Sequence, residues 1–73
     1  MPGSVYKIIE IIGTSTKSWE DAANAAIETA AKSLKDLRIA EVVEMDMQIE
    51  DGKVIAYRTK LHVSFKYLGK EMI

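Results

Sequence analysis

SWEDAANAAIETAAKSLKDL, residues 18–37, is the stretch of this sequence that decides the fold. Its apolar residues recur at intervals of three and four, which places them along one side of an α-helix, and its charged residues lie mostly off that stripe. Ser18 can accept a hydrogen bond from the first turn, and Asp21 three residues later gives a capping-box-like pattern. We therefore predict an amphipathic helix about 30 Å long that packs against a sheet. The stripe comprises Trp19, Ala22, Ala23, Ala26, Ile27, Ala30, Leu34 and Leu37.

The segments on either side of this helix have the composition of β-strands. Residues 5–12 are mostly β-branched, and Gly13 is expected to end this first strand. Residues 38–49 and 53–67 alternate in polarity and are separated by Asp51-Gly52, the signature of a tight two-residue turn. The predicted order is β-α-β-β, with a long hairpin folded over one helix.

Counting outward from that turn gives the pairing of the hairpin. It sets Val42 opposite Leu61, Glu44 opposite Thr59 and Asp46 opposite Tyr57, all on the face that covers the helix. The other face would hold Ile39, Val43, Met45 and Met47, with no second helix in the sequence to bury them. We expect another subunit to bury this apolar face. The alternative is a strongly twisted hairpin that mixes the two faces and buries these residues within the monomer.

Length and composition restrict the class of protein. We expect 73 residues without cysteine to form a single domain, 1–73, with an ordered core of about 4–67 and no disulfide or thiolate chemistry. Ten basic residues against 11 acidic ones argue against nucleic acid as a partner. No apolar run approaches the roughly 20 residues that span a bilayer, and a signal peptide is not evident. We expect a cytoplasmic protein without a membrane partner.

Four segments together carry a family resemblance: VYKIIEIIGTS at 5–15, SWEDAANAAI at 18–27, AEVVE at 40–44 and YRTKLHVSF at 57–65. On these segments the chain resembles the dodecins, small β-α-β-β proteins that form hollow homododecamers and in many members bind flavins. The resemblance implies an α+β fold in which a three-stranded antiparallel sheet curls around one helix, and self-association into a dodecamer.

Two positions depart from the flavin-binding members of that family. Those members carry a tryptophan that stacks on the flavin where this chain has Ile39, and a glutamine that hydrogen-bonds the flavin where it has Arg58. Isoleucine cannot π-stack, and arginine cannot copy an amide's paired donor and acceptor. Ile39 and Arg58 therefore indicate a degenerate flavin site.

The chain also resembles a subgroup that lacks this tryptophan, some members of which are described as calcium-binding. Glu44 and Asp46, with Gln48 next along the strand, offer the hard oxygen ligands that Ca²⁺ prefers. Waters, backbone carbonyls or another subunit would have to complete such a site. The competing interpretation is that these are ordinary solvated residues near a hairpin tip.

No catalytic constellation is recognisable. The single histidine, His62, is expected to face Glu41 across the sheet, and Ser64 lacks an oriented base. We predict a non-enzymatic dodecameric shell that binds and buffers a small ligand or ion, divalent cations such as calcium before flavin. A flavin-binding dodecin with an altered site and a protein-interaction module stay open as alternatives.

Overall fold

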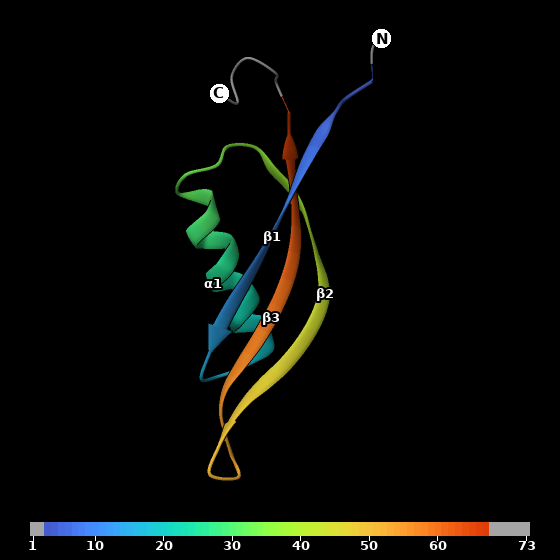
Figure 1. The fold of residues 1–73 in the computed structure, drawn as a ribbon. Helices are drawn as coiled ribbons and strands as arrows, with labels where there is room; N and C mark the ends of the chain where they lie inside the picture. The colour runs from blue at the N-terminus through green and yellow to red at the C-terminus, as the bar shows by residue number, and fades with distance from the viewer. Residues whose placement is uncertain (1–2, 68–73) are drawn as a thin grey trace.

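The computed structural model describes residues 3–67, so both ends of the predicted 1–73 domain lie outside the described residues. The chain runs β1 (Tyr6–Ser15), α1 (Trp19–Ala31), β2 (Leu37–Glu50) and β3 (Lys53–Lys66), as Figure 1 shows. The predicted β-α-β-β order is therefore confirmed. Among residues 3–67, no helix is long and apolar enough to cross a membrane.

The helix begins where the sequence indicates and ends earlier. The Ser18 side chain accepts a hydrogen bond from the Asp21 backbone N–H at 3.0 Å, as expected for the N-cap. The helix ends at Ala31, so the prediction that it continues to Leu37 was wrong. Asp36 has φ of 59°, a left-handed conformation that no helix contains, and it redirects the chain into β2. At 13 residues α1 is about 20 Å long, two thirds of the predicted length.

The three strands form one antiparallel sheet in the order β1-β3-β2. The sheet curls around α1, and the β2-β3 hairpin extends well beyond the helix N-terminus (Figure 1). We call the side that carries α1 the helix face and the opposite side the outer face. The buried core lies on the helix face and consists of Ala22, Ala26, Leu61, Val63 and Phe65. The predicted packing of Leu61 and Val63 against the helix is confirmed, because both cluster with Ala26, and Phe65 is buried on the same face.

The first strand passes through Gly13 and continues to Ser15, so the prediction that Gly13 ends it was wrong. Gly13 is needed for close packing. A Cβ atom at this position would overlap the Ala22 carbonyl oxygen and lie 2.9 Å from the Ala22 carbonyl carbon and 3.0 Å from the Ala26 Cβ. The missing side chain lets the backbone of β1 approach the helix directly.

The hairpin turn matches its prediction. Asp51 has φ of 53° and Gly52 has φ of 75°, the two left-handed residues that a tight two-residue turn requires. The strands on either side begin with Glu50 opposite Lys53, as counted from the sequence. The register changes further along the hairpin, and that change creates the candidate site.

Candidate functional site

Two irregularities in the hairpin move the acidic residues of β2 to the outer face. The register shifts between Gln48 and Ile49 and again between Val42 and Glu44. Between these points Asp46 pairs with Arg58 and Glu44 pairs with Lys60, so the predicted partners Tyr57 and Thr59 were wrong. A single extra residue in one strand reverses which face its side chains occupy.

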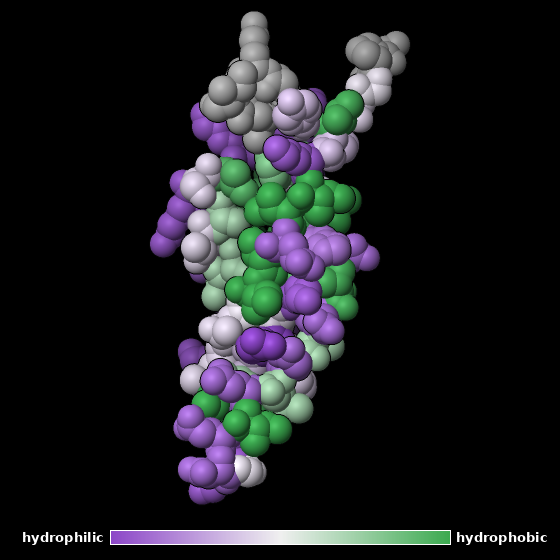
Figure 2. Space-filling model, viewed as in Figure 1, coloured by the Kyte–Doolittle hydropathy of each residue, from purple (hydrophilic) through white to green (hydrophobic). Residues whose placement is uncertain are grey.

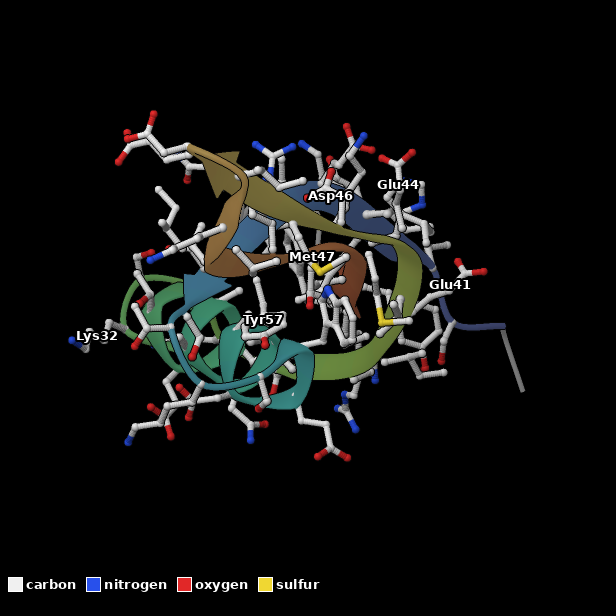
Figure 3. All side chains as sticks on the ribbon, turned by 90° about the horizontal axis from the view of Figure 1, so that it is seen from below. Lys32, Glu41, Glu44, Asp46, Met47 and Tyr57 are labelled. Carbon is white, nitrogen blue, oxygen red and sulfur yellow. The ribbon has the colours of Figure 1, made fainter. Side chains whose placement is uncertain are left out.

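The pairing of β2 beyond Val42 returns to the predicted register. Val42 lies opposite Leu61 and Ala40 opposite Val63, as expected. In the shifted segment Met45 now pairs with Thr59 and Met47 with Tyr57, which puts both methionines on the helix face. Figure 3 shows Glu44 and Asp46 pointing outward, while Met47 and Tyr57 lie on the inner side of the curl with the helix. The prediction that Met45 and Met47 share a face with Ile39 was therefore wrong.

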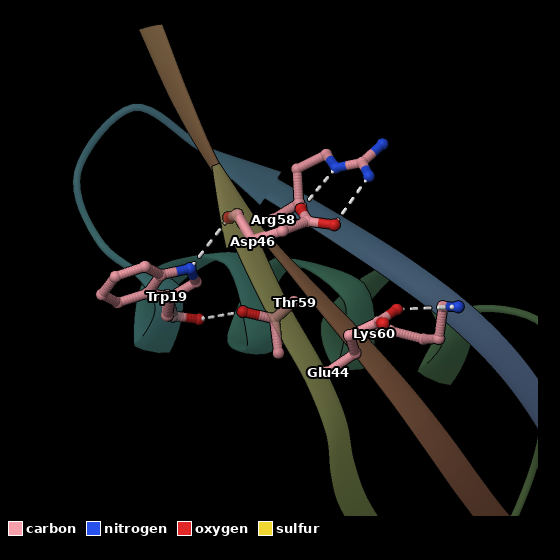
Figure 4. Close-up of polar contacts among 6 residues, drawn as sticks. All are labelled: Trp19, Glu44, Asp46, Arg58, Thr59 and Lys60. Atoms are coloured by element: carbon pink, nitrogen blue, oxygen red, sulfur yellow. Dashed lines mark hydrogen bonds and ion pairs between the residues drawn. The ribbon is translucent and has the colours of Figure 1, made fainter. Parts of the chain in front are cut away.

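Each of the two acidic residues forms an ion pair with its cross-strand partner (Figure 4). Arg58 donates two hydrogen bonds to Asp46, from Nε to Oδ1 at 2.7 Å and from the terminal nitrogen Nη2 to Oδ2 at 2.8 Å. The Lys60 ammonium lies 3.0 Å from Oε1 of Glu44. All four side chains are partly exposed, from 34% for Lys60 to 59% for Glu44. The pairs are therefore well formed but reachable from solvent.

The pKa shifts show that the two ion pairs are electrostatically coupled. The pKa of Asp46 is held below its ordinary value of 3.8, first by the hydrogen bond from Arg58 and further by the positive charges of Arg58 and Lys60, with desolvation opposing. The pKa of Lys60 is raised above 10.5 by its hydrogen bond to Glu44 and by the charges of Glu44, Glu10 and Asp46. The pKa of Arg58 is likewise raised by Asp46 and by the charge of Glu44, so each cation interacts with more than one carboxylate.

Two helix-face residues anchor the strand segment that carries Asp46. The indole Nε1–H of Trp19 donates to the Asp46 carbonyl oxygen at 2.9 Å, and the buried Thr59 hydroxyl donates to the Trp19 carbonyl oxygen at 2.9 Å. The Trp19 ring also meets Tyr57 edge to face, with centroids 5.0 Å apart. Trp19 therefore both packs and positions the site, a role that its place on the helix stripe did not reveal.

The two positions of the degenerate flavin site share the outer face but are separated within one chain. Ile39 pairs with Ser64 and is 68% exposed, while Arg58 pairs with Asp46. Ser64 is six positions after Arg58 along β3, a separation of about 20 Å. One chain does not bring Ile39 and Arg58 together, so a flavin that contacts both would need a second copy.

His62 lies opposite Glu41, as predicted from the sequence. Its imidazole Nε2, however, lies 3.1 Å from Oε2 of Glu10 on β1, a contact that required knowledge of the β1-β3 pairing. Among residues 3–67, no three His, Asp or Glu side chains converge in a way that could hold a metal ion.

The predicted cation ligands have suitable chemistry but form an incomplete set within one chain. Glu44, Asp46 and Gln48 supply carboxylate and amide oxygens on one face, which suit Ca²⁺. Calcium takes six to eight oxygens, more than these three residues provide, and both carboxylates already bind cationic side chains. A calcium ion here would need ligands from water or a second copy and would compete with Arg58 and Lys60.

Comparison with known proteins identifies close relatives across nearly the whole chain. The family model described as Dodecin matches residues 5–68. The calcium dodecin of Mycobacterium tuberculosis is 54% identical over 63 residues, covering 86% of this chain and 89% of that protein. The dodecin of Thermus thermophilus is 39% identical over 64 residues, covering 88% and 93%.

Solved structures agree with the observed fold. The crystal structure of the M. tuberculosis protein, described as a calcium-chelating antigen with a novel calcium-binding site, matches with a TM-score of 0.80 and 51% identity, covering 92% of this chain and 96% of that chain. The dodecin of Streptomyces coelicolor matches with a TM-score of 0.86 and 31% identity, with the same coverage of 92% and 96%.

Proposed function

The chain belongs to the dodecin family, and on that premise we propose that it is a non-enzymatic shell protein whose twelve copies bind and buffer divalent cations, calcium in particular. The observation that carries the choice of calcium is the 54% identity to a relative named calcium dodecin. The name of the M. tuberculosis relative refers to calcium, and His62, the only histidine of the sequence, lies against Glu10 and not against a hydroxyl group. Binding rather than catalysis is therefore the proposed role.

Glu44, Asp46 and Gln48 are the proposed calcium ligands. Their oxygens are exposed on one face, and the Trp19 hydrogen bond to the Asp46 carbonyl fixes the backbone beneath them. Ca²⁺ is expected to bind in preference to Mg²⁺, because a site shared among strands and waters does not impose the near-ideal octahedron that Mg²⁺ demands. A bound ion supplies two positive charges to a face rich in carboxylates.

Exposed apolar side chains support self-association. Met45, Met47 and Val43 are 56%, 44% and 38% exposed, so the monomer does not bury them. The register shift moves Met45 and Met47 to the helix face, as in the alternative of a hairpin that mixes its faces, but it leaves them exposed. Figure 2 shows hydrophobic patches on the surface separated by bands of hydrophilic residues. A second copy that covers these patches would remove apolar area from water, which favours assembly.

The experiment is a thermal melt with and without millimolar Ca²⁺, together with calorimetric titration. An ion that binds only the native state at a hundred times its dissociation constant stabilises it by about 2.7 kcal/mol, so the melting temperature should rise. Glu44→Gln combined with Asp46→Asn should abolish that rise. Glu50→Gln combined with Asp51→Asn, which removes the same charge at the hairpin turn, is the matched control and should retain it. An unchanged melting temperature with no heat of binding would refute calcium binding.

A further inference from the structure

We propose that Arg58 and Lys60 are built-in competitors of the divalent cation, and that their release from Asp46 and Glu44 sets the calcium affinity of the outer face. This proposal rests on the function proposed above and concerns how that site is regulated. The oxygen atoms of Asp46 and Glu44 suit calcium, but cationic side chains already bind them, and the proposal follows from that observation.

The geometry makes Arg58 a direct competitor. Its guanidinium binds both oxygens of the Asp46 carboxylate, at 2.7 Å and 2.8 Å, in the paired arrangement that arginine forms with carboxylates. A metal ion that binds this carboxylate needs the same oxygen lone pairs. Arg58 and Ca²⁺ therefore cannot both have their full set of contacts with Asp46.

Lys60 competes less completely. Its ammonium lies 3.0 Å from Oε1 of Glu44, and it is a single nitrogen, without the two-pronged geometry with which Arg58 binds both oxygens of Asp46. An ammonium is also a compact, strongly hydrated charge that is not held in a fixed geometry. A single ammonium is displaced more easily than a guanidinium that binds both oxygens of a carboxylate, so we expect Lys60 to weaken calcium binding less than Arg58.

The balance of charge leads to the same conclusion. Glu44 and Asp46 carry two negative charges, and Arg58 and Lys60 neutralise them when the pairs are closed. These four side chains together attract a divalent ion only after Arg58 or Lys60 has moved away from its carboxylate. The side chains of Arg58 and Asp46 are 44% and 43% exposed, so this movement leads into water without disturbing the core.

The same exposure limits the size of the effect. Ion pairs between exposed side chains are individually weak because water screens them and holding two long side chains costs entropy. The competition should therefore tune calcium affinity by several-fold and not prevent binding. Removing Arg58 is expected to tighten binding by up to about fivefold, the upper range for breaking one exposed pair.

The test is calorimetric titration of CaCl₂ into the full chain and its variants, with Trp19 fluorescence as a second readout because the indole donates to the Asp46 carbonyl. Arg58→Gln removes the charge and the paired hydrogen bonds, while Arg58→Lys keeps the charge and loses the paired geometry. Lys60→Gln removes the weaker competitor. Arg38→Gln is the matched control, since Arg38 is a charged residue of the same strand as Asp46 whose ion pair is with Asp36 at 4.0 Å.

We expect the calcium dissociation constant to fall most in Arg58→Gln, less in Arg58→Lys and Lys60→Gln, and to stay unchanged in Arg38→Gln. An Arg58→Gln protein that binds calcium no more tightly than the wild type overturns the competition. The two proposals fail separately. A wild type that binds no calcium refutes the proposed function. If Arg58→Gln then binds calcium, that result still supports competition by Arg58. If neither the wild type nor Arg58→Gln nor Lys60→Gln binds calcium, the proposed function and the competition are both refuted.

Discussion

Gly13→Ala should destabilise the protein severely, because β1 and α1 touch through this residue. The new methyl group would overlap the Ala22 carbonyl oxygen and lie 2.9 Å from the Ala22 carbonyl carbon. Carbon and oxygen atoms in contact across backbones normally lie about 3.3 Å or more apart. Both partners are backbone atoms, so no side-chain rotation relieves the overlap, and the helix would have to move away from the strand.

The cost can be bounded from packing and stability data. Inserting one methylene into a packed core typically costs about 1–3 kcal/mol, and a backbone contact that cannot yield belongs at the upper end, near 3 kcal/mol. Each kcal/mol lowers the melting temperature of a domain of this size by about 4–8 °C. The expected fall is therefore about 12–24 °C. Displacing α1 would also pull the Trp19 indole away from the Asp46 carbonyl and loosen the candidate site.

Two other glycines provide controls for this measurement at a fixed protein concentration. Gly3 has no atoms near the place where a Cβ would lie, so Gly3→Ala should leave the melting temperature unchanged. Gly52 also has open space but a φ of 75°, and Gly52→Ala should cost about 1 kcal/mol through backbone strain alone. A Gly13→Ala protein that melts like the wild type would refute the close approach of β1 and α1.

Three further predictions concern ligands, acid and assembly. The double variant Ile39→Trp, Arg58→Gln should quench riboflavin fluorescence, because it supplies a ring that stacks on the flavin and an amide that hydrogen-bonds it. Riboflavin that stays fluorescent would show that the flavin positions are misassigned. An NMR titration should find the pKa of the Asp46 carboxyl below its ordinary value of 3.8. The ion pair then contributes to stability in full above pH 3.8, and the contribution is lost as the pH falls through the lowered pKa. Arg58→Gln should return the pKa toward 3.8, and an identical pKa in the wild type and in Arg58→Gln would contradict the pairing. Size-exclusion chromatography with light scattering should find an oligomer, which Met47→Lys should weaken; a wild type that elutes as a monomer of 8.1 kDa would rule out the shell.

Local sequence signals predicted the elements of the fold. The Asp51-Gly52 turn, the Ser18 cap and the β-α-β-β order of elements along the chain follow from patterns among residues close in sequence, and each is present in the structure. The end of the helix did not follow, because Leu34 and Leu37 continue the apolar period beyond Ala31. The apolar spacing indicates which residues face the core. It does not show whether such a residue belongs to the helix or, like Leu37, to the strand that follows it.

Gly13 shows a second limit of reading the sequence alone. A glycine after a β-branched run usually indicates a turn, whereas here it lies within β1 and lets two backbones touch. The distinction depends on Ala22 and Ala26, which are nearby only after the helix has folded back. The alanine-rich helix did indicate close packing, but the sequence did not show which residue of the strand would meet it.

The register of the hairpin had the largest effect on the interpretation of the site. Counting from the turn assigned Asp46 and Glu44 to the face with Tyr57 and Thr59, where they would have been free to bind a cation. The irregularities next to Glu44 and Gln48 place them instead beside Arg58 and Lys60. Because strand side chains alternate between faces, a shift of one residue changes every partner in the segment. The sequence therefore shows which oxygen ligands the chain possesses, whereas the register shifts of the hairpin determine which cationic side chains those ligands already bind.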